Sequence, residues 1–567
     1  MKKEFKFFYN KISLFVLLLI SIALFIIVNS SDSDFSPPSS PLGFGYIHHP
    51  EGNTGSDCCE HGSATWFVDV NNLNLVIQQT PIWYESAYGP DIDFTLTYNM
   101  LGELSEKSNL GNRWVHSYGE FITKNKNNDG FTYHSSFGRI DEYVLSGREF
   151  IAETEHLGSG DAALMPKLVV TEDVIKAIYV GGAYKEFRLI NDNSYRLIHS
   201  VDRTGNSLDL YYKESLLVKI ENAEGRFISL IYNNQDRLIQ ISGLTGYRVS
   251  FEYDAQNNLV TINDIQGNLT ELGYNDDGHI RSLKNAKDET QFMFEPSDEY
   301  TTRYDTYPAF GEPMGMSSRL TITGSLGGKA EYFYNAESGL AWYVDPENYV
   351  DYRDSSINNS QNDVAKTIYQ YKRYAKGYSR LRKIIYPDNF WESYRYDDNR
   401  NLAEIAYSNG DVYKYKNNAI GNVIHSSDLL GNNADYIYDS NQNIIVSSSD
   451  IGTETFNYDI NNRLISETDS DGYTTRYNYN ARGQLKTILN HDQSVLTFDY
   501  DRDGRLNKLV TDNNTLVQYT YDSLGRIISE VDEYGNTKRY QYDPYNAVIE
   551  FAWCGKNIQI QPSGITD

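Results

Sequence analysis

A short motif, two aromatic residues two positions apart followed by Asp or Asn, returns along this chain about every 21 residues. We take the second aromatic of each motif as the marker of one repeat. In a first block the markers are spaced by 20, 21 and 21 residues: Tyr212, Tyr232, Tyr253 and Tyr274. In a second block the spacings are 19, 23, 20, 21, 21, 21 and 21: Tyr396, Tyr415, Tyr438, Tyr458, Tyr479, Tyr500, Tyr521 and Tyr542. A fixed period of this length is typical of repeat architectures, in which each unit is one small supersecondary structure.

Each repeat has the residues of a β-hairpin in fixed places. Four residues after the marker most units have Gly, Asn or Asp, the types that best tolerate a left-handed backbone. These positions are Asp236, Asn257, Gly278, Asn462, Gly483, Gly504, Gly525 and Asn546, with Gln442 as the exception. Six residues after the marker stands an aliphatic residue such as Leu464, and a second tight turn is predicted near Gly472 or Gly535. We interpret the 23-residue step as a two-residue insertion that moves the turn glycine to Gly421 and the aliphatic residue to Val423.

The aromatic pair of each unit predicts one buried sheet face. Tyr477 and Tyr479 lie two residues apart on a strand, so both side chains leave the same face of the sheet. A single hairpin is only marginally stable, so neighbouring hairpins are expected to join into a continuous sheet. The composition of 48 Tyr and 41 Gly against 14 Pro agrees with strands and tight turns. The fold class is therefore predicted to be all-β.

The repeats divide the chain into segments of different character. The periodic parts are separated by a less regular stretch and preceded by alternating, non-repetitive β-like sequence. The expected segments are 1–30, a signal peptide or membrane anchor; 31–63, a flexible Ser/Pro/Gly-rich segment; 64–184, an N-terminal β domain; 185–299, the first repeat block; 300–366, an irregular repeat or insertion; 367–557, the second repeat block; and 558–567, a C-terminal tail.

The N-terminus predicts export from the cytoplasm. Four lysines among the first eleven residues precede an apolar run at 12–28, which is the arrangement of an export signal. The run has 17 residues, so cleavage after Ser30 and retention as a membrane tether through residues 12–28 both stay open. The protein is expected to be secreted or to lie on the cell surface.

The charge of the chain excludes one class of partner. Its formal charge of −27 becomes −30 when residues 1–30, with four Lys and one Glu, are removed. Nucleic-acid binding requires clustered Lys and Arg, so nucleic acid is not an expected partner. A protein or glycan ligand at the cell exterior is compatible with this charge.

The three cysteines could form a disulfide bridge, and two of them lie near histidines with which they could bind a metal ion. An odd number of cysteines leaves at least one thiol without an intramolecular partner, and a bridge from Cys58 or Cys59 to Cys554 is expected if the two chain ends meet. Thiolates and imidazoles suit zinc or copper. The clustered candidates are His48, His49, Cys58, Cys59 and His61. Their spacing matches no standard metal module, and neither a metal nor a cofactor is expected.

No carboxylate pattern predicts an active site. Residues 499–504 imitate the start of an EF-hand loop, but the twelfth position is Val510 where a bidentate Glu is needed. A glycosidase requires a pair of carboxylates across a groove. Almost every Asp of this chain instead occupies a turn position of a repeat. No catalytic residue is predicted.

The repeat units resemble those of a known family, the YD-repeat or Rhs (rearrangement hotspot) proteins, which include bacterial polymorphic toxins, insecticidal toxin-complex C subunits and teneurins. The resemblance rests on units such as Tyr-Thr-Tyr-Asp-Ser-Leu-Gly-Arg-Ile at 519–527 and Phe-Asp-Tyr-Asp-Arg-Asp-Gly-Arg-Leu at 498–506, and it covers about residues 185–557. Upstream, residues 94–99, 111–118 and 138–143 look like the domain that commonly precedes such repeats in bacterial members. The resemblance implies hairpins that spiral into a curved sheet or hollow β-shell.

Toxin-bearing members enclose a C-terminal toxic polypeptide, which an aspartate-dependent self-cleavage releases. The residues after Tyr542 contain no Asp-Pro-x-Gly cleavage core, so neither self-cleavage nor an attached toxin is expected. The preferred hypothesis is a non-enzymatic, exported β-shell that acts as a scaffold or binding module. The alternatives are a carrier or truncated component of a polymorphic toxin system and, more weakly, a carbohydrate-active enzyme.

Overall fold

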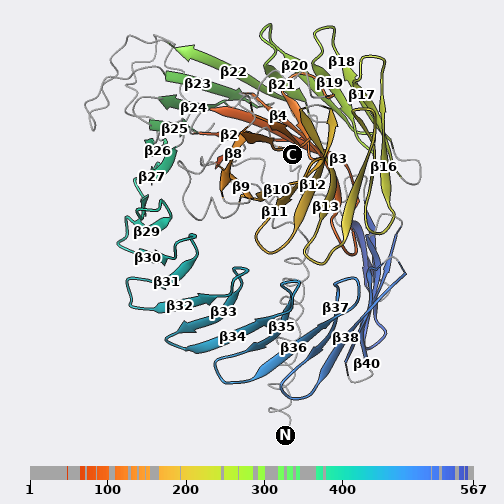
Figure 1. Cartoon of the computed structure of the whole chain (residues 1–567), viewed down its shortest axis with the longest axis vertical. Helices are drawn as coiled ribbons and strands as arrows, with labels where there is room; N and C mark the ends of the chain where they lie inside the picture. The colour runs from red at the N-terminus through yellow and green to blue at the C-terminus, as the bar shows by residue number, and fades with distance from the viewer. Residues whose placement is uncertain are drawn as a thin grey trace.

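The computed structural model is built from β-strands and tight turns, and no helix occurs among the residues that it describes (Figure 1). The structure describes residues 47–48, 64–70, 73–84, 86–100, 109–125, 129–136, 140–146, 149–152, 165–191, 193–243, 248–265, 267–284, 291–299, 317–324, 329–335, 340–344, 366–373, 379–502, 504–511, 514–522, 526–542, 548–553 and 556–559. The predicted export segment 1–30 lies outside these ranges. Within them, no helical stretch has the length and apolar character needed to cross a membrane. The prediction of an all-β fold is confirmed.

A small antiparallel sheet forms first, with its strands in chain order. It consists of β1 (Ile47–His48), β2 (Thr65–Asp69), β3 (Asn74–Tyr84), β4 (Ile92–Asn99) and β5 (Trp114–His116). Most side chains of β2, β3 and β4 are buried, including several polar ones such as Asn74, Thr97 and Asn99. Figure 1 shows this sheet, in red and orange, inside the curve of the larger sheet.

The next eight strands close into a ring. They are β6 (Phe121–Lys124), β7 (Gly130–His134), β8 (Ile140–Ser146), β9 (Glu149–Ala152), β10 (Lys167–Val170), β11 (Val174–Ile178), β12 (Tyr184–Asn191) and β13 (Ser194–Val201). Each strand pairs with the next, and β13 closes the ring because it divides one of its edges. Residues 194–196 of that edge pair with β6, whereas residues 199–201 pair with β14, the next strand of the chain. Segment 64–184, expected as one β domain, thus contributes to the small sheet and to this ring.

From β13 the large sheet continues as one antiparallel ribbon through both repeat blocks. Its first part is β14 (Ser207–Lys213), β15 (Leu216–Glu221), β16 (Phe227–Tyr232), β17 (Leu238–Gly243), β18 (Arg248–Tyr253), β19 (Leu259–Asn263), β20 (Leu269–Tyr274), β21 (Ile280–Lys284) and β22 (Gln291–Glu299). Segment 300–366 supplies β23 (Ser317–Thr323), β24 (Lys329–Asn335) and β25 (Leu340–Val344). These three strands join the two blocks without interrupting the ladder.

The second part of the ribbon holds the C-terminal repeats. Its strands are β26 (Thr367–Arg373), β27 (Ser379–Ile385), β28 (Trp391–Tyr396), β29 (Leu402–Tyr407), β30 (Val412–Asn417), β31 (Val423–Ser427), β32 (Asn433–Tyr438), β33 (Ile444–Ser449), β34 (Gly452–Tyr458), β35 (Leu464–Thr468), β36 (Thr474–Tyr479), β37 (Leu485–Leu489), β38 (Val495–Tyr500), β39 (Leu506–Thr511), β40 (Asn514–Tyr521), β41 (Ile527–Asp532), β42 (Thr537–Tyr542), β43 (Val548–Trp553) and β44 (Lys556–Gln559). The ribbon curves back below the ring, as Figure 1 shows in teal and blue.

The repeat hairpins share one irregularity and one turn. The strand register shifts immediately before the marker, as between Asn478 and Tyr479, and such bulges increase strand twist. The residue four after the marker has a left-handed backbone, with φ of 86° at Gly483. Gln442 and Arg400 adopt the same conformation with φ of 72° and 65°, although neither is Gly or Asn. The turn geometry therefore persists where the residue type does not favour it.

Hydroxyl groups of the markers tie each hairpin to the one before it. Tyr479 donates a hydrogen bond of 2.7 Å to the carbonyl oxygen of Leu464, the aliphatic residue six after the preceding marker. The same bond recurs at 2.6–3.0 Å for Tyr232, Tyr253, Tyr274, Tyr396, Tyr438, Tyr458, Tyr500, Tyr521 and Tyr542. The marker thus combines a ring that packs with a hydroxyl that satisfies a backbone carbonyl.

The marker of one unit was assigned wrongly from the sequence. Asn417, not Tyr415, stands opposite Val423 after the register shift, as Tyr438 stands opposite Ile444. The Asn417 side chain also replaces the tyrosine hydroxyl, because its Nδ2 donates to the carbonyl oxygen of Leu402 at 3.0 Å. The spacing is therefore regular here, and there is no two-residue insertion.

The main core lies between the small sheet and the first repeat block. Trp66 of β2 packs edge-on against Phe292 of β22, with ring centroids 5.5 Å apart. Trp114 of β5 donates from Nε1 to the Tyr274 hydroxyl at 2.9 Å. The small sheet thus supplies the apolar layer that the inner face of the first block requires.

The second block has far fewer buried side chains than the first. From Leu402 to Arg476 the only buried residue is Asn462, and most strand residues are half-exposed. A second, smaller core begins at Tyr477 and consists of Tyr477, Leu485, Ile488, Phe498, Leu509 and Val517. The inner face of β29–β35 is therefore not packed as the first block is.

Candidate functional site

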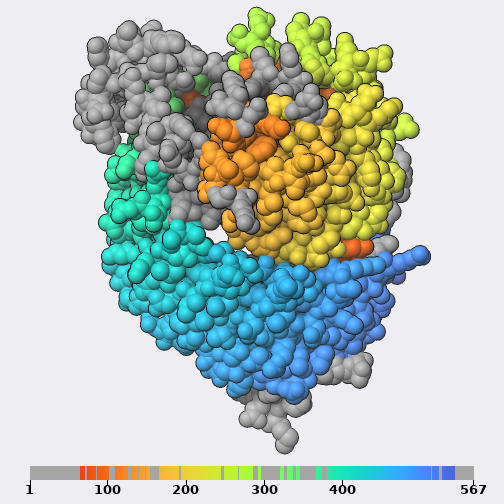
Figure 2. Space-filling view, in the orientation of Figure 1, coloured from red at the N-terminus to blue at the C-terminus, as the bar shows by residue number. Residues whose placement is uncertain are grey.

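The two repeat blocks meet through a loop between β3 and β4. Gln484, in the turn after β36, donates from Nε2 to the carbonyl oxygens of Ala87 and Gly504, each at 2.6 Å. The guanidinium carbon of Arg482 lies 4.7 Å from the centroid of the Tyr88 ring. We use the name seam for this contact and for the neighbouring contacts described next. Those neighbouring contacts are made by Gly181, Thr204, Asn206, Asn462 and Gly483. Figure 2 shows the seam as the line where the blue second block meets the orange and yellow ring.

Further bonds extend the seam to both sides. Asn462 donates from Nδ2 to the carbonyl oxygen of Gly181 at 2.5 Å. Asn206 donates to the carbonyl oxygen of Arg482 at 3.3 Å. Gly483 lies so close to Thr204 that a Cβ would come within 3.0 Å of its side chain. Turns of the second block thus rest on turns of the ring and the first block.

The loop at 86–91 is itself anchored to the first block. Asn222 donates from Nδ2 to the Ser86 hydroxyl at 2.8 Å, and the Tyr88 hydroxyl donates to the carbonyl oxygen of Ala223 at 3.3 Å. The amide of Ala87 donates to the carboxylate of Glu224. The loop therefore bridges one repeat block to the other.

A departure from the repeat pattern marks the seam in the sequence. In neighbouring units the Asp after the marker pairs with an Arg four residues later, and that Arg stacks on the next marker. Thus Arg463 pairs with Asp459 at 2.5 Å and lies 4.7 Å from the Tyr479 ring. The same pattern holds for Asp501, Arg505 and Tyr521 and for Asp522, Arg526 and Tyr542. Asn480 and Gln484 replace the pair in one unit, and this is the unit that reaches Ala87.

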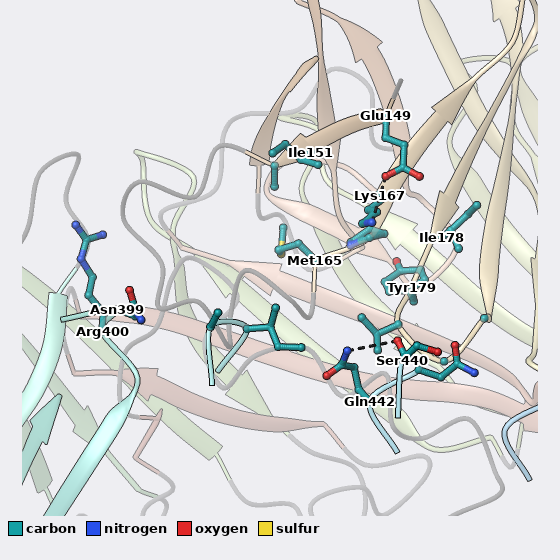
Figure 3. Close-up of a pocket in the computed structure, with 18 of the residues that line it drawn as sticks. Glu149, Ile151, Met165, Lys167, Ile178, Tyr179, Asn399, Arg400, Ser440 and Gln442 are labelled. Carbon is teal, nitrogen blue, oxygen red and sulfur yellow. Dashed lines mark hydrogen bonds and ion pairs between the residues drawn. The ribbon is translucent and has the colours of Figure 1, made fainter. Parts of the chain in front are cut away.

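A cavity of about 860 Å³ opens beside the seam, between the ring and three repeat turns. The ring contributes Glu149, Lys167 and Tyr179. Lys167 and Glu149 form an ion pair of 3.2 Å whose side chains are both more than two-fifths exposed. Such an exposed pair contributes little stability. Figure 3 shows these ring side chains facing the turn residues across the cavity.

The opposite wall of the cavity is rich in amides and hydroxyls. The turns after β28 and β32 supply Asn399, Arg400, Ser440 and Gln442. Gln442 donates from Nε2 to the carbonyl oxygen of Ser440 at 3.5 Å, within its own turn. Amides both donate and accept hydrogen bonds, so this wall suits an uncharged polar ligand. Ile151, Met165 and other aliphatic side chains of the ring complete the lining.

A buried ion pair inside the ring is structural. Lys185 contacts both carboxylate oxygens of Glu120 at 2.9 Å, and Tyr133 donates to Glu120 at 2.7 Å. Burial is the largest single influence on the pKa of Lys185 and lowers it, but the charges and hydrogen bonds of Glu120 and Tyr179 together raise it by more, so the ammonium stays charged. Burial, followed by the charge of Glu120, raises the pKa of Tyr133 well above its usual value. This saturated cluster joins β7 and β12 and leaves no group free to react.

One histidine is held neutral in the same region. Burial, with a further effect of Arg196, lowers the pKa of His116 to about 3. The ring stacks on Phe94 with centroids 4.8 Å apart, and Nδ1 accepts from the Tyr118 amide at 3.2 Å. His116 is therefore a packed core residue.

Several predicted site residues lie outside the described residues. They are His49, Cys58, Cys59, His61, Cys554 and Gly525, and for His48 only the backbone in β1 is described. The expectation that these His and Cys residues hold no metal, and the predicted cysteine bridge, therefore both stay predictions. Across the residues that the structure describes, no group of three or more metal-ligating side chains comes together.

The imitation of an EF-hand has a structural explanation in the described residues. Asp499 lies on β38 opposite Lys508, and Asp501 accepts from the side chain of Arg505 at 2.8 Å. Gly504 is a turn residue with φ of 88°. Asp499 and Asp501 therefore belong to a strand and a turn of one repeat. The seam and the cavity, by contrast, were not predicted from the sequence.

Three comparisons relate this chain to known proteins, and the family model among them agrees with the repeat architecture. The family model described as Teneurin YD-shell matches residues 316–548. No curated protein matches the sequence significantly. The solved structures found include the crystal structure described as TcdB2-TccC3-TEV, at 12% identity and a TM-score of 0.33, which covers 83% of this chain and 27% of that one. They also include the Tc holotoxin pore of Photorhabdus luminescens, at 10% identity and a TM-score of 0.31, which covers 84% and 29%. The chain thus spans less than a third of the length of these structures.

Proposed function

Because this chain belongs to the YD-repeat shell family, we propose that it is a non-enzymatic, exported β-shell that serves as a scaffold or binding module at the cell exterior. The observation that carries the proposal is the cavity beside the seam, which is built on rigid turns and strands and lined by amides, hydroxyls and aliphatic groups. Sites of this kind bind ligands through a few placed polar groups on an apolar wall.

The chemistry of the lining supports binding rather than catalysis. The carboxylate of Glu149 is paired with Lys167. The facing turns present mainly amides and one hydroxyl, and the one carboxylate among them is that of Asp398. A hydrolytic site needs an acid and a base, or a nucleophile with its base, within reach of one substrate atom. Amides and hydroxyls recognise sugar hydroxyls well, so a glycan is the ligand class that this wall fits best.

A glycan array with the exported chain, residues 31–567, tests the binding role. Binding should be weakened about thirtyfold when Asn399 and Ser440 are both changed to Ala, since each lost hydrogen bond costs about 1 kcal/mol. Asn409→Ala is the matched control, because Asn409 is an exposed turn residue on the opposite edge of the sheet. Turnover of any bound glycan in a hydrolysis assay would refute the non-enzymatic role.

Export is tested separately in cells. The full chain should reach the medium or the outer surface, and deletion of residues 1–30 should retain it in the cytoplasm. Equal distribution of the two forms would contradict the exported role without affecting the binding role.

A further inference from the structure

The second repeat block carries very different charges on its two edges. The edge opposite the seam is formed by the second turns of its repeats, and we call it the acidic rim. It comprises residues 407–411, 428–432, 449–452, 469–473, 490–494 and 532–536. These turns contain no Lys or Arg, but they hold Asp411, Asp428, Asp450, Asp469, Asp471, Asp492, Asp532 and Glu533.

The edge that faces the ring carries both signs of charge. Its turns hold Arg400, Arg463, Arg482, Arg502, Arg505 and Arg526 beside Asp397, Asp398, Asp439, Asp459, Asp501 and Asp522. Several of these guanidinium groups are paired with an Asp of their own turn, as described above. Acidic charge without a basic residue is therefore found on the acidic rim and not on the ring-facing edge.

Apolar side chains project from the same rim. Three successive hairpin tips present Leu429 and Leu430, Ile451, and Tyr473, which are 63%, 87%, 91% and 51% exposed. Neighbouring tips on one edge are two strand spacings apart, about 10 Å. Aliphatic side chains with this exposure on consecutive turns are uncommon on a soluble surface and indicate an interaction site.

In the first block, an apolar residue in a comparable turn is covered by the small sheet. Ile265, in the turn between β19 and β20, packs against the main core, and its amide donates to the carbonyl oxygen of Pro81 in β3 at 3.3 Å. Where the small sheet reaches this edge, the apolar turn residue is thus buried against protein. The tips at Leu430 and Ile451 have the same kind of residue and remain exposed.

We propose that the acidic rim of the second block docks a cationic amphipathic polypeptide, with Leu429, Leu430, Ile451 and Tyr473 as apolar anchors and the neighbouring carboxylates as partners for its Lys and Arg. This goes beyond the proposed glycan-binding cavity, because the acidic rim shares no residue with it. The other classes of partner are disfavoured by charge. Nucleic acid and anionic membranes are negative, and a second copy of this chain carries −27 itself.

Local bonds keep the carboxylates of the rim charged. Side-chain and backbone bonds from Asn432 lower the pKa of Asp428, and bonds from Ser494 lower that of Asp492. The Asp428 carboxylate is held by the Asn432 amide at 2.9 Å and by its side chain at 2.6 Å. The negative charge is therefore fixed in place beside Leu429 and Leu430 at neutral pH.

The test measures binding of an 18-residue helical peptide made of Lys and Leu (about five turns) to the chain of residues 31–567 by calorimetry. The variant Leu430→Ser with Ile451→Ser should weaken binding about a hundredfold, since full burial of each aliphatic side chain is worth about a factor of ten or more. Ile460→Ser is the matched control, because Ile460 is 95% exposed on a turn of the other edge. That control should change the affinity less than about twofold.

Charge is tested by a second variant, Asp428→Asn with Asp469→Asn and Asp471→Asn, which should reduce both the affinity and its dependence on salt. Absence of peptide binding, or an equal effect of Ile460→Ser, would overturn the proposal. Stronger binding to phosphatidylcholine or phosphatidylserine vesicles than to the peptide would also overturn it. Glycan binding at the cavity is measured independently, so failure here is distinguishable from failure of the proposed function.

Discussion

The side-chain amide of Gln484 donates a hydrogen bond of 2.6 Å to the carbonyl oxygen of Ala87, 397 residues earlier in the chain. This bond crosses from a turn of the second repeat block to the loop between β3 and β4. Since that loop is anchored to the first block, the contact links two parts of one long β-ribbon that lie far apart along the chain. The closed form of the shell depends on such contacts at the seam rather than on the repeats alone.

Removal of the Gln484 amide should loosen the seam. Gln484→Ala leaves the carbonyl of Ala87 without this donor and should lower the free energy of unfolding by about 1–2 kcal/mol. Amide hydrogen exchange in residues 86–91 should rise with it, because local opening is what that experiment reports. Gln493→Ala is the control, as Gln493 bonds only within its own exposed turn. Equal exchange in the two variants would argue against a closing role for Gln484.

A pair of glycine substitutions separates backbone strain from contact across the seam. Gly504 and Gly472 have φ of 88° and 85°, so alanine is similarly strained at both, by about 1 kcal/mol. A Cβ at Gly504 would also come within 2.9 Å of the Tyr88 ring, whereas nothing lies within 4 Å at Gly472. Gly504→Ala should therefore destabilise by about 1–3 kcal/mol more than Gly472→Ala in chemical denaturation. A difference near zero would mean that the seam is not closed in solution.

The sequence allowed the hairpins to be predicted, because the signals that specify them are local. The period, the turn residues at Gly278, Gly483 and Gly504, and the paired aromatics each depend on neighbours within one unit. The error at Tyr415 has the same origin. The sequence pattern places an aromatic residue at every marker. In this unit the marker is Asn417, whose side-chain amide donates to the carbonyl oxygen of Leu402 as a marker tyrosine would. Hydrogen-bond capacity, not ring character, decides that position.

The seam and the ring were not predictable in the same way. The exchange of the Asp–Arg pair for Asn480 and Gln484 is visible in the sequence, but it has meaning only once Ala87 is placed beside it. The closure of the ring depends on β13 dividing one edge between β6 and β14, and no local pattern specifies that division. Contacts between residues this far apart are fixed by the path of the whole sheet.

The hydrogen bond made by a marker hydroxyl should contribute measurably to the free energy of unfolding. Tyr500→Phe removes the bond of 2.6 Å to the carbonyl oxygen of Leu485 while the ring still packs, and it should cost about 0.5–1.5 kcal/mol. Tyr473→Phe, on an exposed turn of the opposite edge, should change stability by less than about 0.5 kcal/mol. If urea denaturation gives the same midpoint for both variants, the hydroxyl ladder does not contribute to stability.

Stability should fall at alkaline pH because the markers resist ionisation. Burial raises the pKa of Tyr479 and of Tyr521 to about 12, whereas an unfolded tyrosine has a pKa of about 10. Below pH 10 these tyrosines are protonated in both the folded and the unfolded chain, so their contribution to stability is fully present. Above pH 10 the unfolded chain ionises first, so the contribution is lost as the pH rises toward 12. Tyrosinate absorbance should therefore increase together with unfolding, and ionisation of most tyrosines in a still folded chain would contradict this.

The most direct test of the account is a reconstruction by electron microscopy of the chain of residues 31–567. We expect a closed shell in which the turn at Gln484 lies against the loop at Ala87, with the small sheet inside the first block. An open, curved ribbon whose second block does not touch that loop would contradict the central claim that the shell closes at the seam.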